Sequence, residues 1–238
     1  DGGKTFSIKR GMGLVGQIFK ESDLKELAGT RAIGHVRYST TGSSTIKNAQ
    51  PLTVETGRGQ IAIAHNGNLV NAGKLRDELE AEGSIFQTTT DSEIILHLIS
   101  RPNPAIGGGA LAQALSRVHG AYSLVLMGEN EVIAARDPFG FRPLVIGKLD
   151  EAFIFSSETC ALDLVGAEFV REVEPGEIVV ADESGLRSFK PHAETAREAL
   201  CIFEFVYFAR PDSQIGGRNI SHARTRMGRE LARLHPVE

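Results

Sequence analysis

Short runs of β-branched and aromatic residues recur along the chain up to about Ser188, and they constrain its fold more than any other feature. Many of these runs are four to six residues long and are bounded by Gly, Asp or Pro, which is the pattern of short β-strands. The expected strands are Thr5–Lys9, Ala32–Tyr38, Gln60–His65, Ala121–Met127, Glu131–Ala135, Pro143–Ile146, Ala152–Phe155 and Glu177–Val180. A chain with this pattern must place much of its backbone in β-sheets.

Helical periodicity separates the clusters of strands. The expected helices are Asn71–Ala81, a segment that starts at Thr90, Ala110–Val118 and a segment from about Ser221 to Leu234. In the first of them Leu75 and Leu79 fall on one face, and Asn71 is a candidate N-cap. The second opens with the capping-box pattern Thr90-Asp91-Ser92-Glu93. Strand clusters separated by helices predict an α+β fold in which helices pack outside stacked antiparallel sheets.

The composition excludes several classes of function. A net charge of −4 and a pI near 6.0 argue against a nucleic-acid-binding surface. No apolar run approaches the length of a membrane span. Taken with the charge, this means that neither nucleic acid nor a membrane is expected as a partner. The two cysteines, Cys160 and Cys201, cannot build a disulfide framework and fit a reducing cytosol. A connector at Phe189–Glu198 predicts a boundary between a first unit at 1–198 and a second at 199–238.

Three polar stretches follow expected strands or begin an expected helix. Arg37 lies near the end of one β-like run, where a guanidinium can bind a carboxylate bidentately, although a surface salt bridge is the commoner role. Asn66-Gly67 is an ordinary turn signal, but an Asn amide beside a Gly N–H also supplies two donors to an oxyanion. Asp91 caps the helix, presents a carboxylate to an ammonium group, or does both. Together these groups are complementary to glutamine, although their spacing alone does not identify it.

Several runs of residues resemble one known family. The runs GHVRYST, AHNGNLVNAGKL and GSIFQTTTDSE, in this order, are similar to the class II glutamine amidotransferases. Within that superfamily the chain most resembles the amidophosphoribosyltransferase family, through the further runs RDPFGFRPL, SSETCA, REVEPGE and FEFVYFARPDS. The last run is the most specific, because glucosamine-phosphate synthase and asparagine synthetase lack it. The resemblance spans essentially the whole chain.

The resemblance implies a four-layer αββα sandwich of the N-terminal-nucleophile hydrolase type. In that family an N-terminal cysteine attacks the glutamine amide, with its own α-amine as the base. Carried over to this chain, Arg37 holds the substrate α-carboxylate with Thr40 nearby, and Asp91 holds the α-ammonium. Asn66 and the Gly67 N–H form the oxyanion hole. The implied reaction is glutamine hydrolysis with transfer of ammonia to phosphoribosyl pyrophosphate in de novo purine biosynthesis, which gives 5-phosphoribosylamine, glutamate and pyrophosphate.

The chain departs from the family pattern at its first residue, which is Asp1 and not cysteine. Cys160 has no free amine beside it and is expected to be a packed residue at a helix start. The chain is therefore expected to begin inside the family's glutaminase domain and to lack glutaminase activity. The alternative is a truncated or degenerate glutaminase-like module with a binding or regulatory role.

The resemblance assigns 1–198 to the glutaminase domain and 199–238 to the leading portion of a type I phosphoribosyltransferase domain. That α/β domain binds phosphoribosyl pyrophosphate with Mg²⁺, and its phosphate-binding signature does not occur in the sequence. In members with a [4Fe–4S] cluster, a cysteine at the start of the aromatic run supplies one thiolate, so Cys201 is a candidate ligand. A buried thiol is the alternative. The family also implies a homotetramer, located in the cytoplasm or, in a plant, in a plastid.

Overall fold

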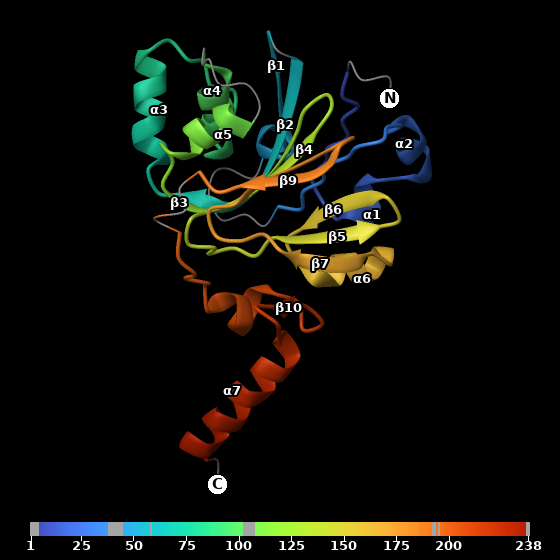
Figure 1. Cartoon of the computed structure of the whole chain (residues 1–238), viewed down its shortest axis with the longest axis vertical. Coiled ribbons are helices and arrows are strands. Elements are labelled where there is room, and N and C mark those ends of the chain that lie inside the picture. Colours follow the sequence, from blue (N-terminus) through green and yellow to red (C-terminus); the bar gives the residue numbers. More distant parts are fainter. Residues whose placement is uncertain are drawn as a thin grey trace.

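The computed structural model describes residues 5–37, 45–57, 59–101, 108–191, 194 and 196–236, and within these ranges six strands form an antiparallel sheet at the centre of the fold (Figure 1). Its strand order is β1-β2-β3-β4-β8-β9. The strands are β1 (Leu52–Thr56), β2 (Gly59–Leu69), β3 (Gly120–Met127), β4 (Val132–Arg136), β8 (Ile178–Asp182) and β9 (Gly185–Phe189). β2 and β3 pair from Ala62 opposite Met127 to Leu69 opposite Gly120.

A second sheet, of three strands in the described residues, packs against one face of the first, in the order β6-β5-β7. The strands are β5 (Val145–Leu149), β6 (Ala152–Ser156) and β7 (Glu168–Glu172). The core between the two sheets contains the buried side chains of Ala134, Leu144, Ile146, Val173 and Val179. Helix α6 (Thr159–Val165) contacts β6 and β7 and packs closely on β5, because a Cβ added at Gly147 would lie 2.5 Å from Leu162.

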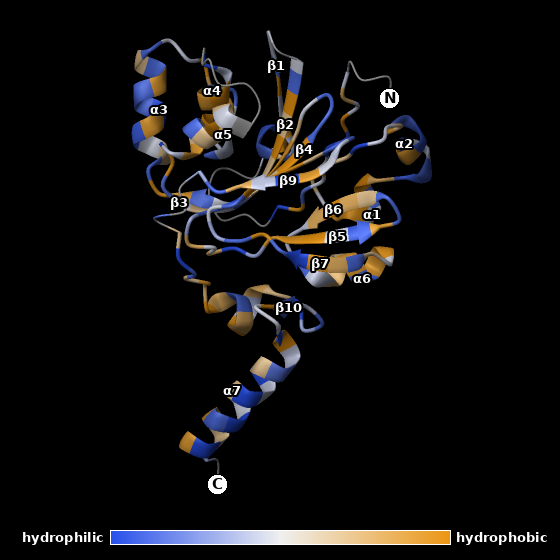
Figure 2. Cartoon of the chain, in the orientation of Figure 1, coloured by the Kyte–Doolittle hydropathy of each residue, from blue (hydrophilic) through white to orange (hydrophobic). Residues whose placement is uncertain are grey.

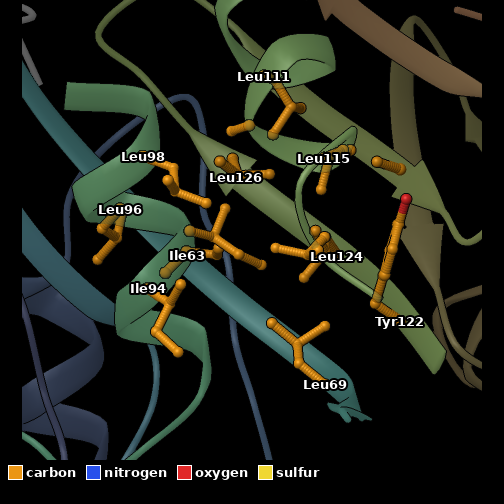
Figure 3. Close-up of a cluster of buried hydrophobic side chains, with 14 of the residues drawn as sticks. Ile63, Leu69, Ile94, Leu96, Leu98, Leu111, Leu115, Tyr122, Leu124 and Leu126 are labelled. Atoms are coloured by element: carbon orange, nitrogen blue, oxygen red, sulfur yellow. The ribbon is translucent and has the colours of Figure 1, made fainter. Parts of the chain in front are cut away.

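Three helices cover the other face of the six-stranded sheet (Figure 1). They are α3 (Ala72–Ala81), α4 (Ser92–Ser100) and α5 (Gly108–Leu115). Side chains alternate between the faces of a strand, which directs Ile63 of β2 and Leu124 of β3 toward these helices. Figure 3 shows both of them beside Ile94 of α4 in one apolar core. The helix pattern that predicts Leu75 and Leu79 on one face is also confirmed, because both are buried.

The resulting layers are helices, six-stranded sheet, three-stranded sheet and helix, so the predicted α+β class and αββα sandwich are confirmed. Five of the expected strands coincide in large part with β2, β3, β4, β6 and β8, whereas the expected Pro143–Ile146 overlaps β5 only at Val145 and Ile146. The sequence pattern does not predict β1, β7 or β9, which are short and mostly not fully buried.

Two expected strands near the start of the chain are wrong. Residues 5–10 and 31–37 have no regular secondary structure, and Tyr38 lies outside the described residues. Side chains make the contacts that a strand ladder would make: Gln60 accepts from the Phe6 N–H (2.6 Å), and Arg10 donates to the Ala49 carbonyl (3.2 Å). Two short helices, α1 (Val15–Ile18) and α2 (Glu21–Glu26), lie between the segments 5–10 and 31–37. A cavity of about 320 Å³ is lined mainly by residues 5–37 and also by Thr53, Ala62 and Met127 of the sheet.

Asn71 stands at the predicted N-cap position of α3, but its side chain does not cap the helix. It donates to the carbonyl of Arg117 (2.9 Å) and accepts from the N–H of His119 (2.8 Å). These two bonds satisfy the loop that leads into β3, so the side chain ties α3 to the neighbouring strand. The cap prediction was wrong because the loop supplies backbone partners from a distant part of the sequence.

The predicted capping box at the start of α4 is also absent. The N-cap residue is Asp91 and not Thr90. The carboxylate of Glu93 accepts the N–H groups of Gln87 and Thr88, both at 2.8 Å, and not that of Thr90. The preceding loop folds back over α4 and offers these amides, so the acid that the pattern assigns to the helix instead holds the loop.

The C-terminal part of the described chain builds a separate small core from Phe205, Ala209, Ile215 and Ile220. Its elements are the π-helical turn η3 (Glu204–Phe208), the hairpin β10 (Gln214–Ile215) and β11 (Arg218–Asn219), and helix α7 (Ile220–Leu234). Helix α7 points away from the sandwich (Figure 1) and carries hydrophilic residues along most of its length (Figure 2). The boundary between 1–198 and 199–238 stays a prediction. No helix in the described ranges is both long and apolar enough to cross a membrane.

Candidate active site

The candidate site lies at the end of β2, where the predicted Asn-Gly turn is wrong. Asn66 and Gly67 lie inside the strand, opposite Ser123 and Tyr122 of β3. The ladder to β3 continues beyond them to Leu69, so pairing with a strand more than 50 residues away overrides the local turn preference. Gly67 has φ +155°, and a Cβ added there would lie 2.1 Å from the Ala121 carbonyl oxygen. The close approach of β3 therefore requires glycine at this position.

Asn66 belongs to the face of β2 that looks toward the second sheet. Side chains alternate along the strand, and its neighbour Ala64 pairs with Val125, which packs in the core between the sheets. The Asn66 Nδ2 donates to Ser157 Oγ at 3.3 Å, and Ser157 directly follows β6. Asn66 is half-buried, so its amide is held in place and still reachable by a ligand.

His65 belongs to the opposite face of β2 and is buried, at 4% exposure. Its Nδ1 lies 3.1 Å from Ser92 Oγ and 3.5 Å from Asp91 Oδ1, while its Nε2 lies 3.4 Å from the Ala121 carbonyl. Gln50 Oε1 accepts the His65 N–H at 2.6 Å. The sequence pattern does not predict a role for this histidine. Its position in an apolar strand, directly before Asn-Gly, is the sequence signal that this histidine is buried and has polar partners.

Asp91 lies at the N-terminus of α4 but makes no cap hydrogen bond from its side chain. Its Oδ2 accepts the N–H of Leu69 at the end of β2, at 2.8 Å. Burial alone would raise the pKa of Asp91, but the hydrogen bond and charge of His65, together with the amide of Leu69, hold it below the ordinary value of 3.8. The side chain is 13% exposed. The site therefore holds an ionised carboxylate beside the end of β2.

His35 brings the segment 31–37 against the same part of β2. Its Nε2 lies 3.0 Å from the carbonyl oxygen of His65, which only a protonated nitrogen can contact as a donor. Burial lowers the pKa of His35, and the charges of His65 and Arg37 lower it further. Arg37 is half-buried and follows His35 by two residues. Thr40, the other residue predicted near the substrate carboxylate, lies outside the described residues.

The RDPFGFRPL run supports the strand residue opposite Asn66 through its buried polar groups. Arg136 and Asp137 are buried at 3% and 0% exposure. Ser123, opposite Asn66 on β3, donates to the Arg142 carbonyl oxygen at 3.1 Å, and Arg136 Nε donates to the same oxygen at 2.8 Å. Burial raises the pKa of Asp137, and three backbone N–H groups on its carboxylate offset this only in part.

Neither cysteine lies in a constellation that would hold a metal. In the described ranges the structure contains no group of three His, Cys, Asp or Glu side chains placed to bind an ion. Cys160 is buried on α6, with its Sγ 4.0 Å from Glu158, and burial raises its pKa. Cys201 is half-buried and precedes η3. A [4Fe–4S] cluster takes four thiolates and the sequence has two cysteines, so these residues alone do not fit one. The cluster ligand at Cys201 stays a prediction.

Comparisons with known proteins agree on one family. Residues 35–164 match the model of the glutamine amidotransferase domain. The amidophosphoribosyltransferase of Archaeoglobus fulgidus is 47% identical over 97% of this chain and 50% of its own length. That of Bacillus subtilis is 43% identical over 99% of this chain and 50% of its own length. An Arabidopsis thaliana relative, named amidophosphoribosyltransferase 2, chloroplastic, is 47% identical over 99% of this chain and 42% of its own length.

Solved structures show the same similarity. The glutamine phosphoribosylpyrophosphate amidotransferase of Bacillus subtilis, complexed with ADP and GMP, superposes with a TM-score of 0.93 at 42% identity, over 99% of this chain and 51% of that one. A structure described as the allosteric regulatory enzyme of purine biosynthesis gives 0.90 at 43% identity, over 95% of this chain and 49% of that one. The chain spans about half the length of the relatives that it matches.

Proposed function

The chain belongs to the glutamine amidotransferase domain family, and from this premise we propose that the end of β2 binds glutamine and positions its carboxamide for hydrolysis. The observation that carries the proposal is that two groups lie at that strand end: Asn66 belongs to it, and the ionised Asp91 carboxylate accepts the N–H of Leu69 three residues further on. Asp91 also contacts His65, the residue before Asn66, so the carboxylate reaches β2 from the face opposite to the Asn66 side chain.

Each residue has a defined part in the proposal. Asp91 pairs with the α-ammonium, and Arg37 pairs with the α-carboxylate through its planar guanidinium. The Asn66 side chain and the Gly67 N–H donate to the carboxamide oxygen as it becomes negatively charged. Thr40 assists at the carboxylate. In the reaction the amide C–N bond breaks, ammonia leaves, and water supplies the new carboxylate oxygen of glutamate.

The attacking group proposed for the family is the thiolate of an N-terminal cysteine. Cys160 does not take that part, because its thiol is buried with a raised pKa, and a buried thiol is a poor nucleophile. The described residues of the site bind the substrate, orient it and stabilise the developing charge. Of these tasks, charge stabilisation by one oxyanion donor typically contributes about 10²–10³ in kcat.

The names of the relatives extend the proposal to a second reaction. Ammonia released at β2 would displace pyrophosphate from phosphoribosyl pyrophosphate and give 5-phosphoribosylamine, the step that an amidophosphoribosyltransferase performs. Mg²⁺ would accompany the phosphoribosyl pyrophosphate, and a homo-oligomer would carry out both steps. A plastid location would follow for a plant protein, as for the Arabidopsis relative, and a cytoplasmic one otherwise.

The test uses the natural protein expressed from its complete gene. Glutamate release from glutamine is measured for the wild type and for Asn66→Ala, with glutamine binding followed by calorimetry. Asn66→Ala is expected to lower kcat about 10²-fold or more while KM changes little, because the donor acts on charge that develops in the transition state. Failure of the wild type to bind glutamine would refute the proposal. Binding without hydrolysis would favour the alternative of a regulatory glutamine-binding module.

A further inference from the structure

We propose that Ser157 is a positioning residue for the glutaminase reaction and that it acts by orienting the Asn66 carboxamide. This inference rests on the proposed function, because it gives Ser157 a purpose only if Asn66 donates to the substrate. Ser157 belongs to the SSETCA run, one of the runs that resemble the family.

The geometry assigns one hydrogen of the Asn66 amide to Ser157. The bond from Asn66 Nδ2 to Ser157 Oγ is 3.3 Å long and joins residues 91 positions apart, from the six-stranded sheet to the turn after β6. An amide nitrogen carries two hydrogens in a plane. When Ser157 accepts one of them, the plane of the amide is fixed and the second hydrogen is left for the substrate oxygen. Without this acceptor the amide rotates about χ2, which is a soft torsion.

The turn that carries Ser157 is itself held firmly. Ser156 Oγ donates to the Glu158 carbonyl at 3.1 Å and accepts the Glu158 N–H at 3.3 Å. The Glu158 carboxylate accepts the Arg210 N–H and the Ser213 hydroxyl, both at 2.7 Å, and Ser213 is fully buried. A hydroxyl on a fixed turn can define the orientation of its partner, whereas one on a mobile loop cannot.

The same contacts give the glutamine site a physical connection to the C-terminal part of the chain. Glu158 joins the turn to the segment 210–213, and the Thr159 Oγ1 accepts the Gln214 N–H at 2.9 Å. A shift of that segment would move the turn and with it Ser157. The orientation of the Asn66 amide therefore depends on the position of the C-terminal segment, although the connection between them runs through Ser157 and Glu158.

The test compares Ser157→Ala, Asn66→Ala and the double variant in the natural protein, by steady-state glutamate release. Ser157→Ala is expected to lower kcat about tenfold and to change KM less than about twofold, since the amide is still present but no longer oriented. Ser157→Thr keeps the hydroxyl and is expected to restore most of the rate. Ser116→Ala is the matched control, because it removes an exposed serine hydroxyl on the turn after α5 that donates to the Gln113 carbonyl and is far from Asn66 in the sequence.

The double variant separates a positioning role from a structural one. If Ser157 acts through Asn66, then Ser157→Ala causes no further loss of kcat in the Asn66→Ala background. Multiplicative losses, or a Ser157→Ala variant as active as the Ser116→Ala control, would overturn the inference while the proposed function stands. An Asn66→Ala variant with unchanged kcat would instead refute the proposed oxyanion donor and, with it, the role of Ser157.

Discussion

Replacing Arg136 by Met tests the claim that a buried guanidinium supports the floor of the site. Arg136 is 3% exposed and donates to three carbonyl oxygens: Nε to Arg142 (2.8 Å), Nη1 to Val173 (2.7 Å) and Nη2 to Gly140 (3.1 Å). Its Nη1 also lies 3.5 Å from the Glu172 carboxylate. Met fills most of the volume of the Arg alkyl chain, so the substitution removes the donors and leaves no large cavity.

The expected cost follows from these contacts. A hydrogen bond that involves a charged group contributes about 1.5–3 kcal/mol, and breaking a buried charged network typically costs about 3–5 kcal/mol. The upper range is reached only when the partners stay buried, and Glu172 is 26% exposed, so part of its charge is solvated after the change. We expect Arg136→Met to lower the free energy of unfolding by about 3–4 kcal/mol. For a unit of about 150–250 residues that shift lowers Tm by about 6–16 °C, and the shift is smaller in a longer cooperative unit.

Thermal unfolding of the natural protein, with hydrogen exchange of the segment 137–142, provides the assay. Arg187→Met is the control, because the Arg187 side chain is 62% exposed in its ion pair with Asp182 and such pairs contribute about 0–1 kcal/mol. Exchange should accelerate at the amides of Phe139 and Phe141, which donate to the Asp137 carboxylate. Equal Tm shifts for the two Arg variants would refute the reasoning, since burial would then make no difference.

Three further predictions concern the glutamine site. Gly67→Ala should lower both kcat and Tm in activity and melting assays, because its Cβ would lie 2.1 Å from the Ala121 carbonyl oxygen. Gly73→Ala in α3 is the control: nothing lies within 4 Å of its Cβ, so it should be neutral or stabilise the protein by about 0.5–1 kcal/mol. Asp91→Asn should raise KM for glutamine at least about tenfold. The wild-type KM should stay constant as pH falls from about 7 to about 5, because the pKa of Asp91 is lowered below 3.8 and its charge is lost only below that value. Arg37→Lys should raise KM with little change in kcat, because Lys cannot bind a carboxylate bidentately.

The strand and helix patterns predict the layers of the fold because each core element has enough local signal. Helix α4 is apolar on most sides, and the strands that pack in the centre consist mostly of apolar residues. The edge strands β1 and β9 and the outer strand β7 carry mixed polar residues, so only their pairing partners define them. At Thr5–Lys9 the local pattern was strand-like, but the segment forms no ladder in the described chain, and a β-like sequence without a partner is not a strand.

The candidate site was predicted as residue types but not as geometry. The amide of Asn66 can donate hydrogen bonds and the carboxylate of Asp91 can pair with an ammonium group, and this chemistry makes both candidates. Their roles as ligands of glutamine stay predictions. Their actual neighbours depend on contacts that sequence spacing does not reveal. Asp91 meets Leu69 across 22 positions, and Asn66 meets Ser157 across 91. For the same reason, longer-range partners override the local preference for a turn at Asn66 and for a side-chain cap at Asp91.

Gly67 explains how a single ligand can use groups on two faces of one strand. The Asn66 side chain looks toward the second sheet, whereas Asp91 reaches β2 from the helical side, next to His65. A Cβ at position 67 would lie 2.1 Å from the Ala121 carbonyl oxygen and 2.7 Å from His65 Nε2, so it would force β3 away and displace the His65 ring beside Asp91. Successive residues on a strand are about 3.3 Å apart, so Asn66 and Leu69, whose N–H the Asp91 carboxylate accepts, lie about 10 Å apart along β2 with Gly67 between them. The absence of a side chain at position 67 is therefore as necessary to the proposed site as the amide and the carboxylate beside it.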